Sequence, residues 1–185
     1  MREIITLIES RSKTDDIEII PLNYSESDLE PVLSKENIKF HYGKLAHGYA
    51  DRFNNKEGDS EFNYAGAFLH NMLFTQYRSS RNNNKPNGPV AKLINSKFKS
   101  WDDFKETFKI EAMKIQGSGW CYLSKDGTIK IIPNHEVRDD ILILVDMWEH
   151  AFQMNYGSDK SRYLDNIWKI INWSVINLRW GASYK

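Results

Sequence analysis

An apolar run that ends in two polar side chains is the feature that most limits how this chain can fold. Residues 141–145 are all aliphatic, and Asp146 and His150 follow within the next five positions. An uninterrupted aliphatic run of this length is typical of a strand buried on both faces. A carboxylate and an imidazole at the end of such a strand need a partner, because burying them unpaired is costly. A bound cation is the simplest partner.

A third polar ligand candidate lies on a predicted helix near the N-terminus. Ser34 is a plausible N-cap for a helix that runs to about Asn54. The candidate is His41. It is followed at intervals of four residues by Leu45 and Tyr49, so all three are expected on one face of that helix.

A second helix is predicted from Ser60, which we expect to cap it, through about residue 74, with His70 on its apolar side. The polar segment 54–59 between the two helices is short enough to form an antiparallel hairpin. Such a hairpin can bring His41 and His70 face to face.

The rest of the chain predicts a mixed lobe. Helical patterns cover residues 90–98, the segment from Ser100, and residues 162–180. Residues 120–123 and 128–132 alternate as strands around the turn formers Asp126 and Gly127, and residues 141–145 supply a third strand. The fold class is therefore α+β, with a helical hairpin followed by a three-stranded antiparallel sheet flanked by helices. Residues 79–89 hold only polar residues and turn formers, so we expect the boundary between two domains there. The predicted organisation is a polar leader at 1–16, a helical-hairpin domain at 17–88 and an α/β domain at 89–185.

Composition excludes several classes of protein. The 25 basic and 25 acidic side chains give zero formal net charge, which predicts no nucleic-acid binding. No apolar run is long enough to cross a bilayer, so a soluble, cytoplasmic protein is expected. The single cysteine, Cys121, fits a reducing compartment and is expected to be a buried apolar residue of a strand rather than a nucleophile.

Three imidazoles and one carboxylate form a donor set that suits zinc, iron or manganese. Taken singly, each has a simpler explanation, since a lone histidine on an apolar helix face is usually a core residue and a carboxylate after a strand is usually a cap. The joint pattern favours a metal site over those readings.

Residues 146–151 resemble the Asp-x-Trp-Glu-His-Ala signature of the iron/manganese superoxide dismutases. Residues 29–34, 40–44, 62–63, 117–120, 163–164 and 172–173 are similar to that family in the same order, so that the resemblance covers about residues 17–180. It implies conversion of superoxide to dioxygen and hydrogen peroxide by one iron or manganese ion per subunit, with a water or hydroxide as its fifth ligand. The metal ligands implied are His41, His70, Asp146 and His150.

The resemblance also implies roles around the metal. Tyr49 corresponds to a gateway tyrosine, and His135 to the residue that hydrogen-bonds the metal-bound solvent. Gly66 lies where iron enzymes often have glutamine, which favours manganese or metal-interchangeable members. An aromatic wall is implied for Phe62, Trp120 and Trp148, and attraction of the anionic substrate for Lys44 and Lys160.

The chain departs from the family at its expected subunit interface. Leu45 and Ala46 replace two histidines, and Gln153 replaces a tyrosine that bonds to one of them across the dimer. Glu149, which bridges to the other subunit's metal ligand in the family, is retained, so an altered homodimer is expected. Two alternatives stay open: a non-catalytic structural subunit that keeps the fold, and a zinc hydrolase, which lacks an obvious general base.

Overall fold

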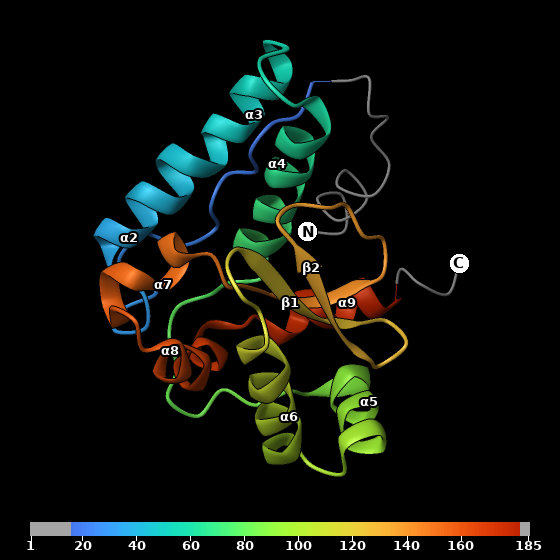
Figure 1. Cartoon of the computed structure of the whole chain (residues 1–185). Helices are drawn as coiled ribbons and strands as arrows, with labels where there is room; N and C mark the ends of the chain where they lie inside the picture. Colours follow the sequence, from blue (N-terminus) through green and yellow to red (C-terminus); the bar gives the residue numbers. More distant parts are fainter. Residues whose placement is uncertain (1–15, 182–185) are drawn as a thin grey trace.

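The computed structural model describes residues 16–181 and shows an antiparallel helical hairpin beside a mixed lobe (Figure 1). Its helices are α2 (Lys35–Phe40), α3 (His47–Asn54), α4 (Ser60–Thr75), α5 (Gly88–Phe98), α6 (Trp101–Met113), α7 (Glu149–Tyr156), α8 (Lys160–Asn166) and α9 (Trp173–Gly181). Its strands are β1 (Gly119–Ser124), β2 (Ile129–Pro133) and β3 (Ile141–Asp146). The predicted α+β class is confirmed, and the predicted leader lies outside the described residues except for Asp16. No helix within residues 16–181 is long and apolar enough to cross a membrane.

The first helix of the hairpin begins as predicted and then changes its winding. The Ser34 hydroxyl accepts the backbone N–H of Asn37 at 3.2 Å and caps α2. A π-helical turn, His41–Ala46, lies between α2 and α3, so the helix reaches Asn54 as predicted but is not α-helical throughout. Because a π turn holds an extra residue, the buried stripe shifts by one position, and Ala46 rather than Leu45 is fully buried between His41 and Tyr49.

The second helix of the hairpin, α4, is a core helix. Its N-cap is Asp59, whose carboxylate accepts the N–H of Phe62 at 2.9 Å, and not Ser60, which is the first helical residue. Every residue from Asn63 to Phe74 is buried, since α4 packs against α3 on one side and β3 on the other.

The sheet has the order β2-β1-β3, and both pairs are antiparallel, as predicted. Gly127 takes a φ of +81° in the turn between β1 and β2, a conformation that favours glycine. In the register of the sheet Trp120 pairs with Ile132 on one side and with Asp146 on the other. The central strand therefore places an indole directly beside the carboxylate at the end of β3.

The segment 162–180 is helical as predicted, but it is interrupted, because the chain forms α8, a 3-10 turn (Ile167–Ile170) and α9. Ile171 between them is extended and forms a β-bridge with Tyr77. The backbone N–H of Asn172 donates to the Gln76 carbonyl at 2.7 Å. These bonds to the segment after α4 replace helical ones, and α9 then packs against β3.

Candidate metal centre

Four side chains from four separate elements meet between the hairpin and the sheet. His41 comes from the π-helical turn, His70 from α4, Asp146 from the end of β3, and His150 from the first turn of α7 rather than from a plain turn. One ligand atom of each lies within 4.8 Å of all the others. Asp146 Oδ2 lies 3.1 Å from His41 Nε2, 3.3 Å from His150 Nε2 and 4.0 Å from His70 Nε2.

The same four atoms have no hydrogen-bond partner. Within the described part of the chain, His41 Nε2, His70 Nε2, Asp146 Oδ2 and His150 Nε2 are all buried and unpaired. Buried polar atoms are normally satisfied, so four orphaned atoms facing one another indicate a missing partner. Three imidazole nitrogens and one carboxylate oxygen fit an iron, manganese or zinc ion.

Hydrogen bonds behind the ligands fix their orientation. Asp146 Oδ1 accepts the N–H of Trp148 at 2.8 Å, which leaves Oδ2 free. His70 Nδ1 lies 2.6 Å from the Gly66 carbonyl and can only donate to it, so Nε2 carries the lone pair in the neutral ring. The Asn37 amide donates to the carbonyl of His150 at 3.3 Å and joins α2 to α7. Such outer contacts hold ligands ready for a metal.

The charges of the site also suit a cation. Burial lowers the pKa of His41, and it lowers the pKa of His70 well below the ordinary value of 6.5. Both rings are therefore neutral at pH 7, the form that binds metals. Burial by itself would raise the pKa of Asp146, but His150 and His41 beside it lower the net value below the ordinary one. Asp146 therefore stays ionised.

Aromatic rings enclose the four ligands on one side. The His135 ring lies 4.6 Å from the ring of Phe62, 4.6 Å from Trp148 in a stacked arrangement, and 4.8 Å from Tyr49. Trp120 lies 5.2 Å from His70. Burial lowers the pKa of His135 to about 4, so its imidazole is neutral. The structure thus brings Tyr49, His135, Phe62, Trp120 and Trp148 together around the four candidate ligands.

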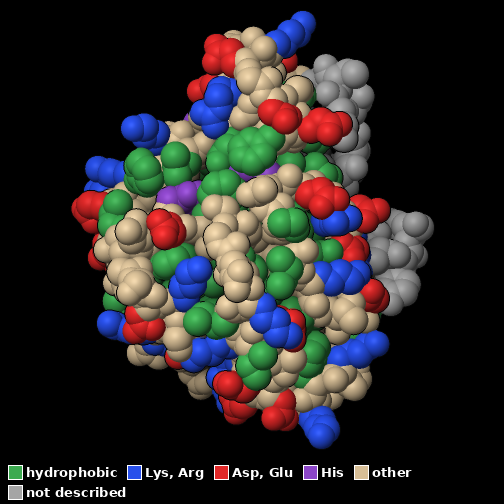
Figure 2. Space-filling view, in the orientation of Figure 1, with side chains coloured by type: hydrophobic (Ala, Val, Ile, Leu, Met, Phe, Trp, Pro, Cys, Tyr) green, Lys and Arg blue, Asp and Glu red, His purple; other side chains and the backbone are tan. Residues whose placement is uncertain are grey.

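The two lysines predicted to attract substrate face other rings. Lys44 Nζ lies 5.8 Å from the centroid of Phe40, and Lys160 Nζ lies 5.7 Å from that of Phe152. Glu149 is exposed at the start of α7. Figure 2 shows histidine atoms at the surface as small patches among hydrophobic side chains, in the upper half of the view.

A buried polar clamp formed by Gln76 and Arg179, which was not predicted from the sequence, lies behind the candidate ligands. The Gln76 amide donates to the Leu144 carbonyl and accepts the Leu144 N–H at 3.1 Å. The Arg179 guanidinium donates to Gln76 Oε1 and to the Leu142 carbonyl, each at 3.0 Å, and to the Met72 carbonyl at 2.5 Å. The clamp therefore ties α9 to the helix and strand that carry His70 and Asp146. Its only signal in the sequence is a charged residue within the apolar pattern of the last helix.

Comparisons with known proteins point to one family. The family described as iron/manganese superoxide dismutases, C-terminal domain, matches residues 86–179. Superoxide dismutase [Mn/Fe] of Porphyromonas gingivalis and superoxide dismutase [Fe] of Bacteroides fragilis are each 32% identical, over 88% of this chain and 98% of theirs. Superoxide dismutase [Fe] of Escherichia coli is 30% identical over 86% of this chain and 95% of its own. This chain belongs to the iron/manganese superoxide dismutase family.

Proposed function

We propose that this protein is a superoxide dismutase, which converts two superoxide anions and two protons to dioxygen and hydrogen peroxide. The observation that carries the proposal is the cluster of four buried, unpartnered ligand atoms in a member of this family. When bound, an iron or manganese ion supplies the redox chemistry, because it can take an electron from one superoxide and give it to another. The ligands we propose are His41, His70, Asp146 and His150.

We assign the orientation of protons to His135, control of access to Tyr49, and the exclusion of water to the aromatic wall of Phe62, Trp120 and Trp148. Neutral His135 accepts a hydrogen bond on Nδ1, so it can donate from Nε2 to a solvent molecule at the metal. Tyr49 contacts both His135 and His70 and is placed to control access to the ligands. Phe62, Trp120 and Trp148 keep the surroundings apolar, which strengthens electrostatic interactions at the site.

Gly66 supports the assignment of His135 as the solvent-bonding residue. A Cβ at position 66 would lie 2.8 Å from ring atoms of Tyr49, too close for any larger side chain while Tyr49 keeps its place. A hydrogen-bonding side chain at position 66 is therefore excluded while Tyr49 keeps its place, and we assign that role to His135 from the loop after β2. This arrangement favours manganese, or the use of either metal.

We further propose a homodimer with an altered interface. Glu149 and Gln153 are exposed on α7, beside the exposed Met154, whereas Ala46 is buried within its own subunit. Glu149→Ala is expected to weaken the dimer, with Glu106→Ala on α6 as control. Light scattering that finds the parent protein monomeric at micromolar concentration would reject the dimer.

The proposal also covers the division of the chain into lobes and the location of the protein in the cell. We propose lobes at 17–88 and 89–185, and the match of the family's C-terminal domain from residue 86 supports this division. A cytoplasmic location stays a prediction based on the single cysteine, Cys121, which is buried in β1 and whose pKa is raised by burial.

The decisive experiment compares metals. Protein reconstituted separately with iron, manganese and zinc is analysed for bound metal, and the disappearance of superoxide is followed directly by stopped flow. We expect near-stoichiometric binding of all three and activity with iron or manganese but not with redox-inactive zinc. Protein that binds iron and manganese but consumes no superoxide would contradict the proposal and support the non-catalytic alternative.

A further inference from the structure

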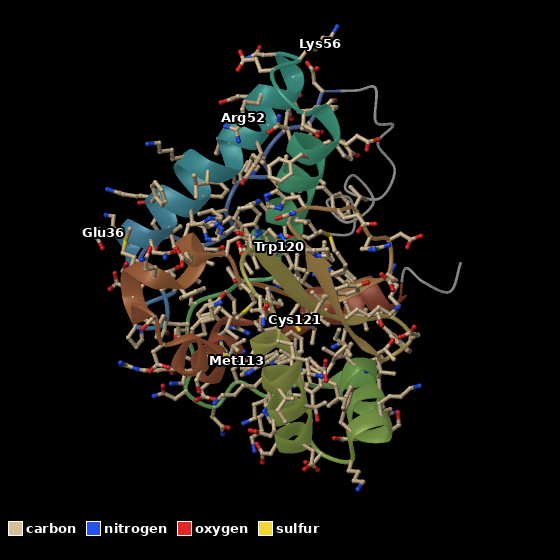
Figure 3. All side chains as sticks on the ribbon, viewed as in Figure 1. Glu36, Arg52, Lys56, Met113, Trp120 and Cys121 are labelled. Atoms are coloured by element: carbon tan, nitrogen blue, oxygen red, sulfur yellow. The ribbon has the colours of Figure 1, made fainter. Side chains whose placement is uncertain are left out.

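Arg52 lies over the ring of Tyr49. Its guanidinium carbon is 4.9 Å from the centroid of the Tyr49 ring. That ring is in turn 5.3 Å from the ring of His70 and 4.8 Å from that of His135. Figure 3 labels Arg52 on α3 and Trp120 nearer the centre of the molecule. One aromatic ring therefore separates this cation from a candidate metal ligand.

The hydrogen-bond partner of Arg52 is a neutral amide, which does not compensate the positive charge of the guanidinium. Arg52 Nε donates to Asn63 Oδ1 at 3.0 Å, and the buried Asn63 is fixed by its own bond to the Glu57 carbonyl at 2.9 Å. Across residues 16–181, no carboxylate forms an ion pair with Arg52. Gly48 gives the guanidinium room, since a Cβ there would lie 3.2 Å from Arg52 Nη1. A neutral, anchored amide thus orients a full positive charge over Tyr49.

A local cation matters in this chain because its formal net charge is zero and gives no overall attraction for anions. Lys44 and Lys160 lie over the rings of Phe40 and Phe152, which are not among the aromatic residues around the four ligand candidates. We propose that Arg52, rather than either lysine, attracts anions to the site and holds the Tyr49 ring in position. The proposal rests on the proposed function only in naming superoxide as the anion.

Azide, a small monoanion that binds to metals, tests the proposal without turnover. Its affinity for the iron-loaded protein is measured by spectral titration of Arg52→Gln at low and at high salt. We expect about threefold weaker binding at low ionic strength and little difference at high salt, because screening shortens the reach of a charge near the surface. The matched control is Lys105→Gln, which removes a cation stacked 5.6 Å over Trp101 on the distant helix α6 (Figure 1).

Three further variants sharpen the test. Arg52→Lys keeps the charge and should recover most of the azide affinity, whereas Lys44→Gln and Lys160→Gln should lose less than Arg52→Gln. Equal affinities for Arg52→Gln and Lys105→Gln would overturn the proposal, and so would an Arg52→Lys variant as weak as Arg52→Gln. If Arg52 governs azide binding but the parent protein consumes no superoxide, the proposed function fails while this inference stands. If the parent protein consumes superoxide but Arg52→Gln binds azide as tightly as the parent does, this inference fails while the proposed function stands.

Discussion

The indole Nε1 of Trp120 donates a hydrogen bond to Nδ1 of His135 at 3.1 Å. Nδ1 must accept this bond, so the proton of the neutral ring lies on Nε2. His135 Nε2 is buried and has no partner among the residues that the structure describes. Trp120 therefore selects the tautomer that can donate to a solvent molecule near His70 and Asp146.

Trp120→Phe is expected to lower turnover about tenfold while metal content stays near that of the parent, because it frees the His135 tautomer without removing a ligand. His135→Leu should do the same. Steady-state rates of superoxide loss and elemental analysis measure the two effects. Trp101→Phe, an indole change on α6, is the control. Parent-like turnover in both site variants would remove His135 from the proton path.

His150→Ala is expected to lower metal content at least tenfold, since it deletes one of four donors and opens the site to solvent. Metal content after dialysis against a weak chelator is the measurement. His47→Ala removes a histidine from α3 that lies outside the cluster, and it should retain metal. Equal metal content in the two variants would exclude His150 as a ligand.

Arg179→Met is expected to lower the free energy of unfolding by about 3 kcal/mol, because it removes the buried hydrogen bonds that Arg179 donates to Gln76 Oε1 and to the Leu142 carbonyl. Gln76→Leu should act in the same direction by breaking the bonds to Leu144. Chemical denaturation of the metal-free protein measures both. The control Arg138→Gln removes an exposed ion pair with Glu136 and should cost under about 1 kcal/mol.

Acid should destabilise the metal-free protein before any carboxylate titrates. Burial lowers the folded-state pKa of His41, His70 and His135, to about 4 for His135. The unfolded chain therefore binds protons first, so stability is full above about pH 6.5 and falls as the pH drops, for His135 until about pH 4. Each such histidine adds a slope of about 1.4 kcal/mol per pH unit. Denaturant titrations across this range should show a smaller slope for His135→Leu, and identical slopes would contradict the assignment.

Local patterns of the sequence were sufficient for most of the fold. The alternation around Asp126 and Gly127 and the aliphatic run of β3 predict the observed antiparallel sheet. Ser34 caps its helix as expected. These features depend on neighbours within a few residues, and such preferences are legible without coordinates.

Two departures from regular α-helix occur where distant contacts override local preference. With the π-helical turn His41–Ala46 in the helix, the His41 ring contacts that of His70 while Tyr49 contacts the rings of His70 and Phe62. The last helix breaks at Ile171 because Tyr77 and Gln76 offer its backbone alternative bonds. Neither partner is near in sequence, so no window of residues contains the information.

By itself the sequence determined the identities of the four ligand candidates, the class of fold and the family. The ligand candidates are recognisable because a polar group within an apolar pattern is costly to bury and needs a partner. The tertiary structure alone decided the tautomer of His135, the clamp of Gln76 and Arg179, and the place of Arg52 over Tyr49. Each of these depends on a side-chain direction and on a bond between residues far apart in the chain. Such bonds are fixed only once the lobes have packed.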